Sequence, residues 1–231
     1  MIQSPRRRTL GSDVGARLGS VTASSAVADV WYAWVGDHAR DVDQFSREYL
    51  SSEEDGRRRQ YRSREAAERY VVTRSLVRIV LSERLGIPGR EIRVDRTDTG
   101  KPVVAEEGGI HFNVTHSADL ILLAVSDARP VGVDIERKRD VARVHALVAR
   151  WLTDAERNEL AQLTNRGASS SDAFLRIWSL KEARLKALGV GISGAAGALL
   201  HSVDARPLDD LLESLPGRPR EQHYVGAIAF A

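Results

Sequence analysis

Three short segments of the chain carry carboxylate, ammonium and imidazole side chains at spacings that could support chemistry. They are Asn113 to Ser117, Val131 to Glu136, and Trp178 to Lys186. Carboxylates gathered without thiols suit a hard cation such as Mg²⁺, which binds through one or two carboxylates together with substrate phosphates. The nearby lysines and arginines would then face the phosphates. These residue types favour a Mg²⁺ site that binds a phosphate-bearing ligand.

Local periodicity places the reactive side chains on defined faces. In a strand, alternate residues point to opposite sides, so Asp134 and Glu136 share one face of the expected strand over 131–136. In the expected helix over 173–188, Trp178, Glu182 and Lys186 are four residues apart and form one row. The chain has no cysteine and no Gly-x-Ser-x-Gly sequence. A thiol nucleophile and a serine on a nucleophile elbow are therefore excluded.

Helices and antiparallel hairpins alternate along the chain, and this pattern predicts an α+β fold. Helices are expected over 41–50, 64–85, 140–151, 153–163 and 173–188, with a further helix start at 51–54. Strands are expected over 30–35, 110–114, 120–126, 131–136, 199–203 and 224–230. Turns or loops are expected over 98–102, 165–172 and 189–198.

The composition is that of an ordinary globular protein. The chain has 231 residues, of which 42% are hydrophobic and 29% charged, and a formal net charge of +2. The absence of cysteine excludes disulfides and thiolate metal sites. No run of about 18 apolar residues could span a membrane. We expect residues 1–28 to be a disordered basic extension of a cytoplasmic protein, because their content is mostly small and polar.

The three segments, together with Gly100-Lys101-Pro102, resemble the motifs of the phosphopantetheinyl transferases of the surfactin-synthetase-activating type. The resemblance covers residues 30–231 and includes the order and spacing of the segments. It implies a monomeric pseudo-dimer of two similar α+β halves, 29–115 and 116–231, with the active site in the cleft between them. It also implies transfer of 4'-phosphopantetheine from coenzyme A to a serine of an acyl- or peptidyl-carrier protein, in many relatives for secondary metabolism.

The resemblance also implies roles for individual residues. Asp134, Glu136 and Glu182 match the ligands of Mg²⁺, for which Mn²⁺ is a possible substitute. Glu182 is the first choice for the base that takes the serine proton, and Glu136 is the second. Lys186, which matches the lysine near the diphosphate, is the third expected catalytic residue. The matching contacts to coenzyme A come from Lys101, Arg57, Arg69, Thr115, His116 and Lys186. Glu54 departs from the pattern, because some relatives carry a basic residue there.

Several alternatives stay open at the level of sequence. The arginine clusters at 6–8 and 57–59 suggest a nucleic-acid-binding protein, although the chain is almost balanced in charge. A relative that binds coenzyme A without transferring from it, or another Mg²⁺-dependent transferase without a P-loop, would also fit. Taken alone, Asp134 and Glu136 could be a solvated strand face, and Glu182 with Lys186 a helical ion pair.

Overall fold

Two antiparallel sheets pack face to face and form the centre of the protein. The computed structural model describes residues 14–23, 26–105, 109–191, 200, 202–217 and 222–231. The first sheet has the order β1-β2-β6-β5, with strands Ala16–Ala23, Ala26–Trp34, Leu120–Ser126 and His111–Ser117. The second has the order β7-β9-β8, with strands Val131–Arg137, Tyr224–Phe230 and Asp204–Pro207.

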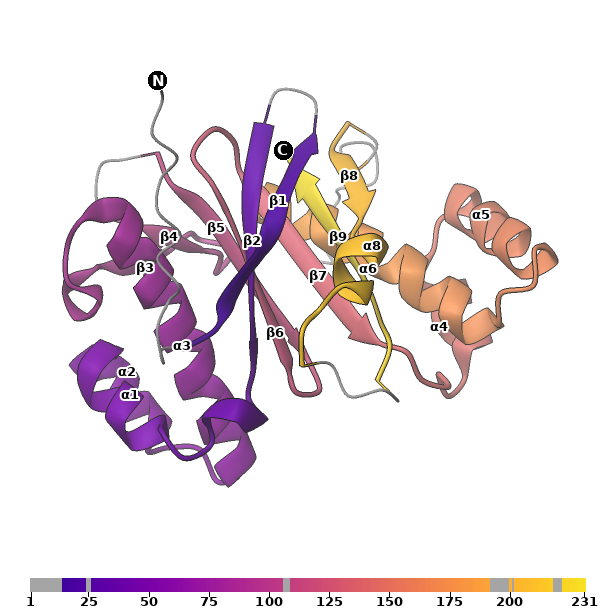
Figure 1. Cartoon of the computed structure of the whole chain (residues 1–231). Coiled ribbons are helices and arrows are strands. Elements are labelled where there is room, and N and C mark those ends of the chain that lie inside the picture. The colour runs from indigo at the N-terminus through magenta and orange to yellow at the C-terminus, as the bar shows by residue number, and fades with distance from the viewer. Residues whose placement is uncertain (1–13, 24–25, 106–108, 192–199, 201, 218–221) are drawn as a thin grey trace, which may run out of the picture.

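Helices cover the outer faces of both sheets (Figure 1). On the first sheet lie α1 Val42–Tyr49, α2 Ser52–Arg58 and α3 Arg64–Leu85, followed by the small hairpin of β3 Val94–Arg96 and β4 Pro102–Val104. On the outer face of the second lies α6 Ser170–Leu188, flanked by α4 Val144–Trp151 and α5 Asp154–Asn165. The short α8 Asp209–Glu213 instead packs its Leu212 into the core between the two sheets. Two 3₁₀ turns complete the described elements, η1 Gly36–His38 and η2 Gly89–Glu91.

The continuous apolar sequence of β6 follows from its central place in these layers. Every residue of the strand is buried. Leu120 and Leu122 face the second sheet, whereas Ile121 and Leu123 face α3. Because both faces of β6 are covered, the strand does not alternate between apolar and polar residues.

Strand β7 alternates in character because its two faces meet different partners. Val131, Val133 and Ile135 enter the core between the sheets, as the sequence predicts. Gly132 lies under α6, where an added Cβ would be 2.1 Å from the carbonyl oxygen of Ala183. The missing side chain at this position lets α6 approach the strand closely.

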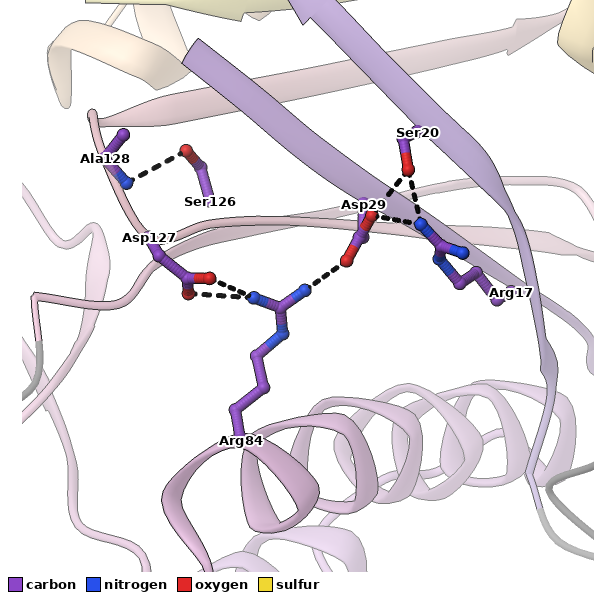
Figure 2. A network of polar contacts seen from close by, with 7 residues as sticks. All are labelled: Arg17, Ser20, Asp29, Arg84, Ser126, Asp127 and Ala128. Carbon is purple, nitrogen blue, oxygen red and sulfur yellow. Dashed lines mark hydrogen bonds and ion pairs between the residues drawn. The ribbon is translucent and has the colours of Figure 1, made fainter. Parts of the chain in front are cut away.

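The N-terminal region differs from the expectation of a disordered extension over residues 1–28. Residues 1–13 lie outside the described part of the chain, but Ala16–Ala23 forms β1 and pairs with β2. Figure 2 shows that Asp29 of β2 accepts hydrogen bonds from Arg17 and Ser20 of β1, and that Arg84 of α3 contacts both Asp29 and Asp127. Small and polar residues are here held in a strand by ladder hydrogen bonds and ion pairs, which their composition does not reveal.

Most expected helices and strands are confirmed, and the fold is α+β. The helix over 64–85 and the strands over 120–126 and 224–230 have the expected bounds. The strand expected over 199–203 is displaced, since the chain turns at 202–203 and β8 begins at Asp204. Residues 199 and 201 of that expected strand, and 192–198 of the expected loop, lie outside the described residues. The predicted division at residue 115 falls inside β5, whereas the turn at 127–130 separates the two sheets.

Within the described residues no helix is long and apolar enough to cross a membrane.

Candidate active site

The three sequence segments with reactive side chains meet where β5, β7 and α6 come together. Lys186 of α6 donates from Nζ to Asp134 Oδ1 of β7 at 2.6 Å and to Thr115 Oγ1 of β5 at 3.3 Å. The hydroxyl of Thr115 in turn donates to Asp134 Oδ1 at 3.3 Å. One contact group thus contains a residue from each of the three segments.

Asp134 is the most perturbed carboxyl group of this cluster. Its residue is only 6% exposed. Burial, together with the negative charges of Glu136 and Glu182, raises the pKa of Asp134 to about 6, against the opposing effect of Lys186. Glu136 and Glu182 are therefore close enough to Asp134 to repel its charge. An additional positive charge at this position would relieve that repulsion.

The donor set fits a hard cation, although the three carboxylates do not form a closed metal site. Among the described residues, no three His, Asp or Glu side chains converge closely enough to hold a metal ion. Glu136 instead accepts hydrogen bonds from Arg139 at 2.8 Å and from Ser117 at 3.4 Å. However, Asp134 Oδ2 is buried and has no hydrogen-bond partner among the residues that the structure describes. An unpartnered, buried carboxylate oxygen beside two further carboxylates is suited to Mg²⁺.

A cavity of about 550 Å³ with many arginines adjoins this cluster. It lies between α2, α3 and the segment from η2 to β3, and His116 of β5 also lines it. Arg57 and Arg69 are on its wall, as the family resemblance implies for residues that bind phosphate. Desolvation and the positive charges of Arg69 and Lys186 lower the pKa of His116, so its ring favours the neutral form.

Adjacent residues of β5 connect the cavity with the carboxylates. Thr115 and His116 point to opposite faces of the strand, as period-two geometry requires. Thr115 contacts Asp134 and Lys186, whereas His116 lines the cavity. A ligand whose phosphates extend past this strand would therefore meet both groups.

Glu54, which departs from the pattern of the family, is a buried partner for two arginines of the cavity wall. Its carboxylate accepts from Arg74 Nε at 2.6 Å and from Arg78 Nε at 2.5 Å. Although burial acts to raise it, the charges and hydrogen bonds of these arginines bring the pKa of Glu54 below its usual value. Glu54 thus neutralises part of the positive charge around the cavity.

Lys101 does not line the cavity, so the structure does not bring it together with Arg57 and Arg69. Its ammonium group donates to the carbonyl oxygens of Ala187 at 2.8 Å and Val131 at 3.2 Å. Desolvation lowers its pKa to about 8. Lys101 therefore connects the β3–β4 hairpin to the end of α6 and the start of β7.

Lys181 precedes Glu182 in sequence but points away from the carboxylate cluster. Its Nζ atom donates to the carbonyl oxygen of Trp151 at 2.6 Å and to Glu156 Oε2 at 2.9 Å. Glu156 also completes the capping box of α5 with Thr153. The expectation that all the lysines near the site face phosphate is wrong for Lys181, because one step along a helix rotates a side chain by about 100°.

Two further polar residues, Asn113 and Ser117, hold β7 against β5 at this site. Asn113 Oδ1 accepts from the backbone nitrogen of Val133 at 2.9 Å, and Ser117 Oγ accepts from that of Arg137 at 3.0 Å. Together with Thr115 they occupy alternate positions of β5. Their period-two spacing was the available signal, but the strand they would face could not be identified from sequence.

Comparisons with known proteins give concordant matches over most of the chain. Residues 130–222 match the model of the 4'-phosphopantetheinyl transferase superfamily. Residues 39–128 match the model described as 4'-phosphopantetheinyl transferase, N-terminal. The two matches meet at the turn that separates the two sheets.

Individual relatives agree with these matches. The chain is 33% identical to the 4'-phosphopantetheinyl transferase HetI of a Nostoc species over 192 residues, which cover 79% of this chain and 78% of the relative. It is 29% identical to the 4'-phosphopantetheinyl transferase Sfp of Bacillus subtilis over 145 residues, covering 63% and 62% of the two chains. It is 36% identical to the L-aminoadipate-semialdehyde dehydrogenase-phosphopantetheinyl transferase of Xenopus laevis over 129 residues, covering 52% and 42%.

Proposed function

Because the chain belongs to the 4'-phosphopantetheinyl transferase superfamily, we propose that it transfers the 4'-phosphopantetheine group of coenzyme A to a serine hydroxyl of a carrier protein. The observation that carries this proposal is the position of β5 between an arginine-rich cavity and a buried carboxylate cluster. Coenzyme A has a 3'-phosphate and a diphosphate, which need basic contacts at two separate places. The two sides of β5 supply them.

The basic side chains would hold the coenzyme. Arg57 and Arg69 on the cavity wall would contact its 3'-phosphate, and His116 would contact a phosphate at the edge of the cavity. Lys186 lies on the other side of β5 and would approach the diphosphate. Lys101 would contribute by holding α6 against β7, since its ammonium is engaged with backbone carbonyls.

The acidic side chains would carry the chemical step. Asp134, Glu136 and Glu182 would hold Mg²⁺, or Mn²⁺ in its place. Bound Mg²⁺ would neutralise negative charge on the diphosphate and polarise the phosphorus under attack. Glu182 would accept the hydroxyl proton of the carrier serine while the serine oxygen forms a bond to the β-phosphorus of coenzyme A. The bond from that phosphorus to the bridging oxygen breaks, and adenosine 3',5'-bisphosphate leaves.

We infer that the chain is a pseudo-dimer whose active site lies between two halves. Two family models that match successive parts of the chain support this inference, as does the arrangement of one long helix on each sheet. An acyl- or peptidyl-carrier domain is the expected partner. A monomeric state, a cytoplasmic location and a place in secondary metabolism remain predictions of the family resemblance.

The nucleic-acid alternative has little support from the arginines near residues 57–59. Arg58 is paired with Asp43 and Asp55, and Arg59 is paired with Asp55. Arg57 lines the cavity. These side chains therefore do not form an unneutralised basic stripe, which non-specific binding to a phosphate backbone requires.

The deciding experiment is intact-mass spectrometry of an apo carrier protein incubated with this protein, coenzyme A and Mg²⁺. We expect the carrier to gain the mass of one phosphopantetheine group, and to gain nothing after chelation of the metal or with Glu182→Gln. Glu159→Gln is the matched control, because Glu159 is an exposed residue of α5. Binding of coenzyme A without transfer to any of several acyl- and peptidyl-carrier proteins would instead identify a binding protein that lacks transferase activity.

A further inference from the structure

The two sheets meet along a row of side-chain hydrogen bonds. Strands β5 and β7 belong to different sheets, and β7 pairs along its other edge with β9. Asn113 accepts from the nitrogen of Val133, and Ser117 accepts from the nitrogen of Arg137. The edge of β7 that faces β5 is thus held by side chains of β5 at two points four residues apart.

These two points bracket the carboxylates of the proposed metal site. Asp134 and Glu136 lie between Val133 and Arg137 in the sequence of β7. Thr115 contacts Asp134, and Ser117 donates from Oγ to Glu136 Oε2 at 3.4 Å while accepting from the backbone of β7. Asn113 and Thr115 are 6% and 7% exposed, so water has little access to replace their bonds.

We propose that Asn113 and Ser117 are positioning residues that fix β7 against β5 and thereby set the placement of the Asp134 and Glu136 carboxylates. The inference rests on the proposed function, because it concerns the metal site of that reaction. Backbone hydrogen bonds in a sheet hold a strand whatever its side chains are. Across this boundary, two particular side chains hold it, so the metal site depends on them.

Their position also explains why neither residue needs to touch the substrate. Asn113 is bonded to the backbone of Val133, one residue before Asp134. Ser117 is bonded to the backbone one residue after Glu136 and to the Glu136 carboxylate itself. Loss of the Asn113 amide or of the Ser117 hydroxyl would let one end of the Asp134–Glu136 segment shift. The residues of α2 and α3 that line the cavity, and His116, would keep their positions.

The test compares Ser117→Ala with Ser117→Thr, which keeps the hydroxyl, and uses Ser126→Ala as the matched control. Ser126 is a buried serine of the neighbouring strand β6, and its contact is with Ala128. Binding of Mn²⁺ is measured by electron paramagnetic resonance in the presence of coenzyme A, and binding of coenzyme A is measured separately. We expect Ser117→Ala to weaken Mn²⁺ binding about fivefold, the factor for one hydrogen bond of ordinary strength. Ser117→Thr should restore it, and affinity for coenzyme A should stay within about twofold.

Two results would overturn the inference. One is Mn²⁺ binding by Ser117→Ala that equals the wild type. The other is an equal loss in Ser117→Ala and Ser117→Thr, which would assign the effect to side-chain volume. Asn113→Leu provides a second test with the same expected loss of Mn²⁺ affinity. If Asn113→Leu does not fold, the comparison of Ser117→Ala with Ser117→Thr decides.

The proposed function fails by a different observation. If the wild-type protein binds Mn²⁺ and coenzyme A but modifies no carrier, the transferase activity is refuted. The comparison of Ser117→Ala with Ser117→Thr still decides the positioning role in that case, because metal binding is measured without turnover.

Discussion

Replacing Gly132 by alanine should separate α6 from β7 and thereby disrupt the site. The new Cβ would lie 2.1 Å from the carbonyl oxygen of Ala183 and 2.3 Å from the nitrogen of Ala187. Ordinary van der Waals contact begins at 3.4 Å, so the helix must retreat by about 1.3 Å, the difference between 3.4 and 2.1 Å. Both atoms belong to the backbone of α6, and no rotation of a side chain can relieve the contact.

The consequences can be estimated from this displacement. Overpacking of this kind costs about 3 kcal/mol, the upper part of the usual range, because two backbone atoms are involved. In a chain of this size that loss lowers Tm by roughly 6–12 °C. The retreat also takes Lys186 Nζ out of hydrogen-bond range of Asp134 Oδ1, now 2.6 Å away. A misplacement of about 1 Å can lower kcat on the order of a hundredfold.

The assay measures thermal unfolding together with the rate of carrier modification by intact-mass spectrometry. Gly56→Ala in α2 is the matched control, because nothing lies within 4 Å of its added Cβ. Alanine there should raise stability by about 0.5–1 kcal/mol, since glycine is unfavourable inside a helix, and leave the rate unchanged. A Gly132→Ala protein with the Tm and the rate of the wild type would refute the argument.

Three further substitutions test other contacts. Lys181→Met leaves the partly buried carboxylate of Glu156 without its cation and should cost about 2 kcal/mol in urea unfolding, less than for a fully buried pair. Adding Glu156→Gln should recover part of that loss, and an unchanged unfolding midpoint in the single variant would contradict a stabilising pair. The pKa of Lys101 is about 8 when folded and 10.5 when unfolded, so the unfolded chain binds the proton more tightly. The stability difference between wild type and Lys101→Met should therefore shift in favour of the wild type as pH rises from 8 toward 10.5, and a flat difference would argue against burial of the ammonium. Arg84→Met removes the ion pairs that link α3 to Asp29 and Asp127. Because these pairs are partly exposed, the free energy of unfolding should fall by only about 1 kcal/mol. The midpoint of urea unfolding measures this loss, and an unchanged midpoint would mean that the pairs do not stabilise the fold.

The sequence by itself determined the family, the reaction class and most regular elements. Periodicity alone placed Val131 and Val133 opposite Asp134, because side chains in a strand alternate whatever the strand packs against. The order and spacing of the three segments led to the transferase family, which the comparisons confirm. These are local properties, or properties of order along the chain, and both can be read without knowing any long-range contact.

Only the tertiary structure decided which of the nearby polar residues share a site. Lys181 and Glu182 are neighbours in sequence, yet Lys181 binds Glu156 and the end of α4 whereas Glu182 lies near Asp134. Lys101 belongs to a family motif, yet its ammonium contacts carbonyls of β7 and α6. The roles of Asn113 and Ser117 depend on β7 lying beside β5 across a boundary between sheets. Such placements follow from how helices and sheets pack over long sequence separations, and side-chain patterns within one segment do not encode them.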